Sequence, residues 1–144
     1  MDIAPFVEVR VTQNFSAPAS RVFDAWIDPA IAGHWLFATA SRPPARVTID
    51  ARVGGAFRFV ERSGGIGVEY AGEYVEIDRP RRLVFTLASA QHLGDPARVA
   101  VDIAPERKGC RLTLVHAGVL GDEAPRIEGR WAGMLYGLRA LLDR

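Results

Sequence analysis

The sequence is poor in cysteine, with Cys110 as the only one among its 144 residues. A single thiol excludes an internal disulfide and a metal cluster held by thiolates, and it is typical of proteins in a reducing compartment. Long hydrophobic runs are also missing, and residues 1–11 contain neither a basic start nor a continuous apolar segment. We therefore expect a cytoplasmic protein that does not insert into a membrane.

An excess of charge of either sign is absent as well. Lys and Arg number 18 and Asp and Glu number 17, which leaves a net charge of +1. Proteins that bind nucleic acids or anionic membranes usually concentrate basic residues on one face and have a strongly basic composition. We therefore expect no nucleic-acid partner.

The composition that remains is that of an ordinary folded protein. Hydrophobic residues make up 49% and charged residues 24% of the chain, which are usual values for a globular domain. The length allows one sizeable hydrophobic core without disulfides or metals. We expect residues 1–144 to form a single domain.

The strongest periodic pattern lies in residues 126–144, which predict one amphipathic helix. Apolar side chains recur there at helical spacing and fall on one stripe; they are Ile127, Trp131, Met134, Leu135, Leu138, Leu141 and Leu142. Gly129, Gly133 and Gly137 line another edge. Because each glycine costs a helix about 0.5–1 kcal/mol relative to alanine, we expect this edge to leave room at a cavity or to approach a sheet closely.

Alternation of apolar and polar residues predicts seven strands, at residues 8–15, 46–50, 56–61, 67–77, 82–88, 97–104 and 110–116. The short turns between most of them favour antiparallel neighbours. The inward parity of Val68 and Tyr70 does not continue to Val75 and Ile77. This break predicts a β-bulge at residues 72–74.

Two short helices are predicted between the first and second strands. Pro18 favours the start of one that runs through Trp26, and Asp28 with Pro29 ends it and starts another that reaches Trp35. Strands segregated from helices and joined by short links predict an α+β fold with one antiparallel sheet. One long helix covers such a sheet only in part, so we expect a cavity between them, with a fully packed core as the alternative.

Several motifs resemble, in the same order along nearly the whole chain, the activator of Hsp90 ATPase homologue 1-like family of START-like (SRPBCC, Bet v 1-like) domains. The matching segments are residues 17–18, 22–23, 25–29, 35, 50–57, 72–74, 80–85, 112–118 and Trp131 with Leu135 and Leu138. The family usually has glycine directly before the helix tryptophan, where this chain has Arg130. The resemblance implies a helix-grip fold, in which a curved seven-stranded antiparallel sheet wraps around the long C-terminal helix and encloses an apolar tunnel.

The same resemblance implies several functions. Proteins of this kind bind lipids, sterols, polyketides or other hydrophobic small molecules, a minority catalyse cyclisation or hydrolysis, and the founding members stimulate a chaperone ATPase. We expect a hydrophobic small-molecule ligand; a polyketide-cyclase-like or hydrolase-like enzyme and an Hsp90-type chaperone-modulating interaction module are the alternatives, because a fold alone does not choose a function. An exposed sheet edge leaves a homodimer open.

Inward-facing side chains supply the candidate ligand-binding residues, which are Phe57, Phe59, Tyr70, Phe85, His116, Trp131 and Leu135. Trp26 and Trp35 are assigned to the core. His116 continues the inward parity of Leu114 and is a candidate hydrogen-bond donor or proton carrier, with a structural role at the strand end as the alternative. Glu61 shares parity with Phe59 and is the candidate inward carboxylate.

No complete catalytic constellation is present in the sequence, which argues against an enzyme. Glu69 and Glu73 have the parity of the solvated face, so they do not form a pair suited to glycoside chemistry. His34, His92 and His116 lack the spacing of metal ligands. We predict no catalytic residue, no metal site and no cofactor.

Overall fold

In the part of the chain that the structure describes, seven strands and three helices follow one another in the predicted order. The structure is a computed structural model, and it describes residues 6–37, 46–63, 66–89 and 97–143. The elements are β1 (Phe6–Phe15), α1 (Ala19–Ile27), α2 (Pro29–Ala32), β2 (Arg46–Ile49), β3 (Ala56–Ser63), β4 (Ile66–Asp78), β5 (Arg82–Ser89), β6 (Ala97–Glu106), β7 (Gly109–Leu120) and α3 (Ala124–Leu142). Each predicted strand and helix is confirmed, with shifts of a few residues at its ends.

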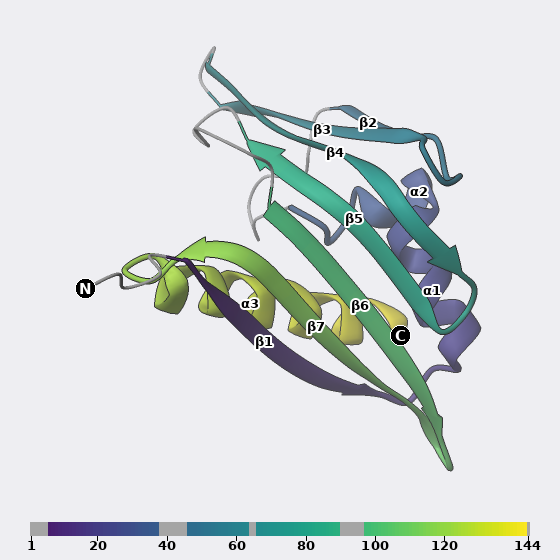
Figure 1. The fold of residues 1–144 in the computed structure, drawn as a ribbon. Helices are drawn as coiled ribbons and strands as arrows, with labels where there is room; N and C mark the ends of the chain where they lie inside the picture. The colour runs from purple at the N-terminus through teal and green to yellow at the C-terminus, as the bar shows by residue number, and fades with distance from the viewer. Residues whose placement is uncertain (1–5, 38–45, 64–65, 90–96, 144) are drawn as a thin grey trace.

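The strands form one antiparallel sheet in the order β1-β7-β6-β5-β4-β3-β2. Figure 1 shows this sheet curving around α3, which runs along the side formed by β1, β7 and β6. The short helices α1 and α2 cover another part of the same face: α1 lies near β6 and β7, α2 lies near β2, and Trp26 of α1 reaches Phe85 of β5. This is the predicted α+β helix-grip fold, and it divides the inner face of the sheet between two different helical partners.

The inward parity of β1 is confirmed over most of the strand. Val9, Val11 and Phe15 are buried. Val7, which has the same parity in the sequence, is 40% exposed, so the predicted burial does not extend to this residue. The pairing of β1 with β7 shifts register between Val7 and Val9, where two steps along β1 match three along β7.

The irregularity predicted for β4 is present, but it lies after residue 74 rather than at residues 72–74. The pairing of β4 with β5 shifts register between Tyr74 and Glu76, and Tyr74 is buried. Inward parity therefore continues from Tyr70 through Gly72 to Tyr74 and breaks only there. A Cβ on Gly72 would lie 2.8 Å from the Phe57 ring and closer still to the Thr86 carbonyl oxygen, so this glycine permits close packing and does not mark the bulge.

The apolar stripe of α3 is buried as predicted. Trp131, Leu135, Leu138 and Leu142 are buried, and Ile127, Met134 and Leu141 pack against the core from partly buried positions. The predicted loop after Gly118 is shorter than expected, since β7 continues to Leu120 and α3 already begins at Ala124. The helix therefore follows the sheet almost directly.

The glycine edge of α3 contradicts both predictions made for it. Gly129, Gly133 and Gly137 are exposed, and a Cβ on any of them would meet no described atom within 4 Å. Gly129 and Gly133 each lie two residues from Trp131, about 200° around the helix. The glycines therefore face away from the sheet, and they neither border the cavity nor allow a close approach.

Replacing Gly133 with alanine is therefore expected to raise the free energy of unfolding by about 0.5–1 kcal/mol, because alanine restricts the unfolded chain and no described atom obstructs its methyl group. Urea denaturation followed by circular dichroism measures this change, and Gly129→Ala offers an independent repeat. A decrease in stability would contradict the exposed orientation of this edge.

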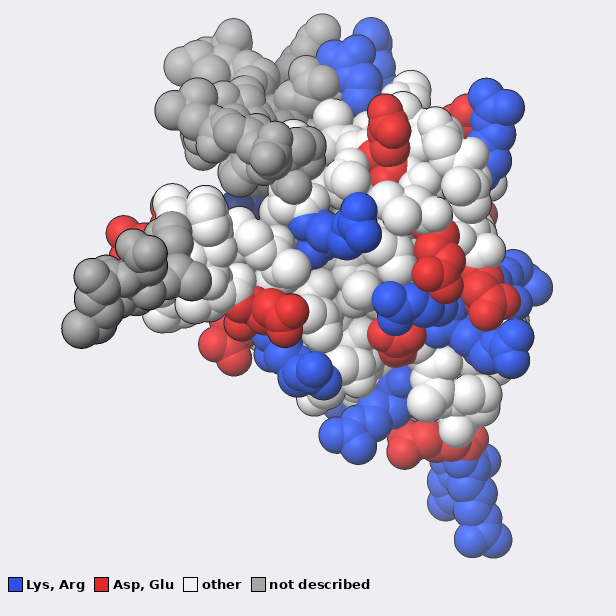
Figure 2. Space-filling model, in the orientation of Figure 1, with Lys and Arg blue, Asp and Glu red and all other residues white. Residues whose placement is uncertain are grey.

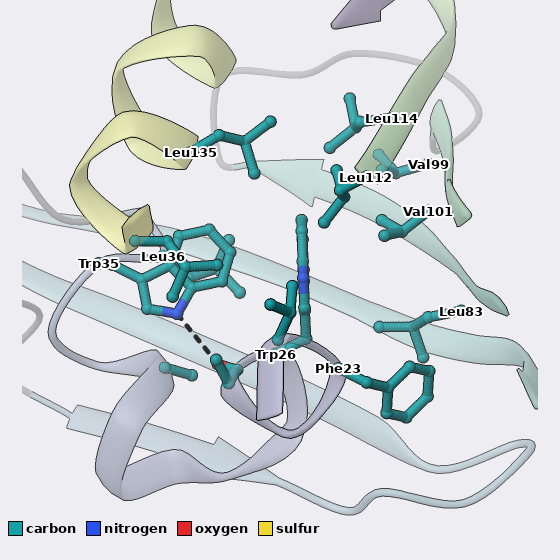
Figure 3. Close-up of a cluster of buried hydrophobic side chains, with 14 of the residues drawn as sticks. Phe23, Trp26, Trp35, Leu36, Leu83, Val99, Val101, Leu112, Leu114 and Leu135 are labelled. Atoms are coloured by element: carbon teal, nitrogen blue, oxygen red, sulfur yellow. Dashed lines mark hydrogen bonds between the residues drawn. The ribbon is translucent and has the colours of Figure 1, made fainter. Parts of the chain in front are cut away.

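The core between the sheet and the short helices is built around two tryptophans. Figure 3 shows Trp26 directed into a cluster of aliphatic side chains, with Trp35 beside it. Their rings meet edge to face at 4.7 Å, and Trp35 Nε1 donates to the Ala25 carbonyl at 3.0 Å. Trp26 Nε1 is buried and has no partner among the described residues. Both tryptophans thus belong to the core, as predicted.

Candidate functional site

A cavity of about 420 Å³ lies between the sheet and the N-terminal half of α3. Its walls come from β1, β4, β5, β6, β7, α3 and the segment after α2; they are formed by Phe6, Phe37, Tyr70, Leu87, Ala97, His116, Gly118, Val119, Leu120, Glu123, Arg126, Ile127, Arg130, Trp131 and Met134. The cavity predicted from one helix lying on a wide sheet is therefore present, and the fully packed alternative is wrong.

The inner walls of the cavity are apolar. Phe37, Leu87, Val119 and Trp131 are buried core residues that also border the empty space. At its edge, Phe6 is 55% exposed and Leu120, which is paired with it across β1 and β7, is 45% exposed. Apolar surface thus extends from the interior to the outside of the molecule.

The α3 side chains reach the cavity because of their helical spacing. Ile127, Trp131 and Met134 recur at four and three residues and share the inward stripe. Arg126 and Arg130 each precede an inward residue by one position, so they lie about 100° around the helix. This offset places both guanidinium groups at the rim of the cavity rather than in its interior, and both residues are exposed.

Phe37 joins the short helices to the cavity wall. Its backbone has a φ of 56°, unusual for a residue other than glycine, and its N–H donates to the Met134 sulfur at 3.2 Å. The ring stacks on Tyr70 with centroids 4.5 Å apart and meets Trp131 edge to face at 5.9 Å. Phe37 follows α2 in a segment without strand or helix periodicity, so no sequence pattern identifies it as a wall residue.

Tyr70 links the aromatic wall to the rim. Arg130 Nη2 donates to the Tyr70 hydroxyl at 2.6 Å, and the guanidinium carbon lies 5.6 Å from the centre of the Tyr70 ring. Arg126 instead forms an ion pair with Glu123 at 3.0 Å. At the rim, Arg126 is therefore paired with a carboxylate, whereas the described side-chain contacts of Arg130 are to a tyrosine.

His116 lies at the inner end of the cavity and is 7% exposed. Its Nδ1 accepts a hydrogen bond from Trp131 Nε1 at 2.9 Å. An acceptor nitrogen requires neutral imidazole with its proton on Nε2. The histidine therefore ties β7 to α3, so the structural role that the sequence left as an alternative is present at a residue that also borders the cavity.

The structure divides the seven predicted wall residues into two groups. Tyr70, His116 and Trp131 border the 420 Å³ cavity. The other four lie in the packed interior and do not border it; they are Phe57, Phe59, Phe85 and Leu135.

The three phenylalanines point inward as expected but face a different partner. Phe57 packs against Phe59 and Phe85 with ring centroids 6.0 and 5.4 Å apart, and Phe85 lies 6.1 Å from Trp26. A void of only about 10 Å³ remains among these rings. Trp26 of α1 and Leu36 fill this part of the inner face, and Phe59 also meets the Phe37 ring at 5.1 Å. The 420 Å³ cavity lies beside it, under α3.

Groups suited to other chemistry are few in the described part of the chain. No cluster of three or more His, Cys, Asp or Glu side chains there is arranged to hold a metal ion. Cys110 is buried outside the cavity, its thiol donates to the Ala17 carbonyl at 3.5 Å, and burial raises its pKa. A protonated, buried thiol is a poor nucleophile.

The polar residues considered in the sequence are described only in part. Glu73 is exposed, in keeping with its predicted solvated face. The side chains of Glu61 and Glu69 lie outside the described part of the structure, as does His92. The described polar groups at the cavity are therefore Tyr70, His116 and the three charged rim residues.

Charge is evenly distributed on the face of the molecule shown in Figure 2. Basic and acidic side chains alternate there without a wide area of one sign. None of the described helices is long and apolar enough to cross a bilayer.

Comparison with solved structures supports the same architecture. CV1439 from Chromobacterium violaceum has a TM-score of 0.86 and 26% identity, with 95% of this chain and 97% of that chain covered. Mll3558 from Rhizobium loti has a TM-score of 0.78 and 26% identity over 94% and 96% of the two chains. An AHSA1-like protein from Aeromonas hydrophila has a TM-score of 0.83 and 20% identity over 95% and 92%.

No functionally curated protein matched the chain. The family model described as activator of Hsp90 ATPase homolog 1-like protein matches residues 16–143. This match extends from the end of β1 to the end of α3 and so includes most of the cavity wall. The chain therefore belongs to the activator of Hsp90 ATPase homolog 1-like family, the family that its sequence motifs resemble.

Proposed function

We propose that this protein binds a hydrophobic small molecule in the cavity between the sheet and α3. The observation that carries the proposal is the cavity itself, whose volume of about 420 Å³ falls within the roughly 300–1,000 Å³ usual for small-molecule sites. Its inner walls are aromatic and aliphatic, and the exposed Phe6 and Leu120 continue them outward. Burial of about 200 Å² of apolar ligand surface would contribute about 5 kcal/mol before the costs of association.

A binding protein fits the described groups better than a cyclase-like or hydrolase-like enzyme. The cavity is lined by no serine, cysteine or lysine of the described residues, so no nucleophile of these types faces His116. Nδ1 of His116 is already engaged by Trp131. A catalytic base needs a reacting proton within hydrogen-bond reach and a free acceptor, which favours retention of a ligand over its conversion.

The chaperone-modulating alternative is also less well supported. A protein that acts only through its surface has no need for an apolar cavity that reaches into the core, whereas the described residues border one under α3. Interiors are normally packed as densely as organic crystals. Empty space of about 420 Å³ beside buried core residues is therefore best explained by a ligand.

Native mass spectrometry of freshly purified protein tests the proposal, first for a co-purified passenger and then with a panel of fatty acids, sterols and aromatic polyketides. A thermal shift assay gives a second readout, since a ligand at 100 times its Kd stabilises the folded state by about 2.7 kcal/mol. Consistent absence of binding across the panel would refute the proposal.

A cavity-filling variant distinguishes this site from adsorption elsewhere. Ala97 borders the cavity, so Ala97→Phe is expected to place a ring in it and weaken binding at least about tenfold, equivalent to about 1.4 kcal/mol. Ala104→Phe makes the same change at an exposed position of the same strand and is expected to leave binding unchanged. Equal binding by both folded variants would place the ligand outside the cavity.

A further inference from the structure

The rim of the cavity carries more positive than negative charge. Its charged lining residues are Glu123, Arg126 and Arg130, all at or near the start of α3. Glu123 and Arg126 neutralise one another through their 3.0 Å ion pair. Arg130 has no carboxylate among the described residues within ion-pair distance, so its charge is uncompensated beside an apolar space.

Arg126 and Arg130 lie near the N-terminus of α3, where positive charge does not stabilise the helix. The first turn of α3 contains no acidic residue and includes Arg126, and Arg130 follows one turn later. A helix N-terminus carries partial positive charge, so cations near it lower helix stability. Departures from local stability rules are expected where a function requires them.

Arg130 and Tyr70 form a pair of hydrogen-bond donors at this rim. A guanidinium group has five N–H donors, and the described contacts of Arg130 use one of them, to the Tyr70 hydroxyl. Because this hydroxyl accepts that bond, its own proton is available to a further acceptor, and no described residue provides one. Stacking on Phe37 fixes the Tyr70 ring, so both donors are held in place before a ligand arrives.

The chemistry that matches this arrangement is an oxyanion attached to an apolar body. Arginine recognises carboxylates through two parallel N–H donors, and the single uncompensated charge matches a monoanion. A dianionic phosphate would add a second negative charge close to Glu123. We propose that the ligand is an amphipathic carboxylate whose carboxylate group binds Arg130 and the Tyr70 hydroxyl while its apolar part fills the cavity. This inference rests on the proposed function and adds the charge and headgroup of the ligand.

Matched ligand pairs test the inference with the full chain. Dissociation constants are measured by isothermal titration at pH 7.5 for dodecanoate and dodecan-1-ol, and for 2-naphthoate and 2-naphthylmethanol. Wild-type protein is compared with two variants, Arg130→Gln and the control Arg139→Gln. Arg139 is an exposed arginine of the same helix; it pairs with Asp143 at 3.8 Å and does not border the cavity. Thermal melts establish that each variant is folded.

The preference for carboxylate over alcohol is expected to fall at least about tenfold in Arg130→Gln and to stay unchanged in Arg139→Gln. Tyr70→Phe is expected to reduce the same preference by about threefold, because it removes one donor and keeps the stacked ring. Added salt is expected to weaken the carboxylates alone, since the rim is exposed.

Three results would overturn the inference. If the probes bind wild-type protein but the preference is the same in Arg130→Gln, the carboxylate assignment is wrong and the proposed function stands. If none of the four probes binds wild-type protein, the carboxylate assignment fails as well, and the wider panel then decides the proposed function. A loss of carboxylate binding in Arg139→Gln equal to that in Arg130→Gln would show a general charge effect and also overturn it.

Discussion

Replacing Trp131 with alanine is expected to lower the free energy of unfolding by about 3–5 kcal/mol. The indole is among the largest fully buried side chains. It lies 6.1 Å from the Trp26 ring and 5.9 Å from the Phe37 ring, and its N–H donates to His116. The substitution would therefore open a cavity between α3 and the sheet and leave a buried imidazole nitrogen without its partner.

Two further variants separate these contributions in urea denaturation curves. Trp131→Phe keeps an aromatic ring but removes the N–H that donates to His116, so losing this buried hydrogen bond is expected to cost about 1–3 kcal/mol. Tyr136→Ala, at a position of the same helix that is 66% exposed, is expected to change stability by less than about 0.5 kcal/mol. A loss below about 1 kcal/mol for Trp131→Ala would contradict the anchoring role of the indole.

Replacing Gly72 with alanine is expected to destabilise the protein by about 3 kcal/mol or more, at the upper end of the range for overpacked cores. The added methyl group would meet the Thr86 carbonyl oxygen well inside contact distance and the Phe57 ring at 2.8 Å. Backbone atoms cannot rotate away as a flexible side chain does. Relief would require β4 to move away from β5 in the middle of the sheet.

The same chemical change at Gly133 is the matched control, because it is expected to stabilise the protein. Both variants add one methyl group, but the changes in the free energy of unfolding measured in urea are expected to be opposite in sign. If Gly72→Ala had the stability of the unchanged protein, the close packing of β4 against Phe57 and β5 would be wrong. If both variants were destabilised equally, the assignment of exposed and packed glycines would fail.

The stability and the proposed function depend on some of the same residues. Trp131 anchors α3 and also borders the cavity, and Phe37 contacts both Trp131 and Tyr70. The rim arginines contribute little to the core, since both are exposed. Variants at the rim are therefore the informative ones for binding, because they alter the ligand contacts while leaving the packing intact.

The number, order and type of the elements could be predicted from the sequence. Alternation along the strands and the helical stripe of α3 are local consequences of burying one face of each element. The stripe centred on Trp131 and Leu135 could be identified without knowing which surface it packs against. Short turns between successive strands also limited the sheet to antiparallel neighbours, which is the arrangement found.

The cavity wall could be predicted only in part. Phe57, Phe59 and Phe85 have the same inward parity as Tyr70, but Trp26 of α1 and the segment after α2 cover them, whereas Tyr70 meets the open space under α3. Parity reports that a side chain is buried and not which remote element buries it. The positions of α1, α2 and α3 on the sheet decided this division.

By itself the sequence determined an α+β fold with one antiparallel sheet, the buried stripe of α3 and the inward direction of the aromatic residues, because each follows from local periodicity. The helix-grip arrangement was implied by the resemblance to a known family. Only the tertiary structure decided that Phe37 joins the cavity wall and that Arg130 meets Tyr70 at the rim. These features depend on contacts between segments distant along the chain, as between Arg130 and Tyr70, 60 residues apart. Periodicity within one element contains no information about such contacts.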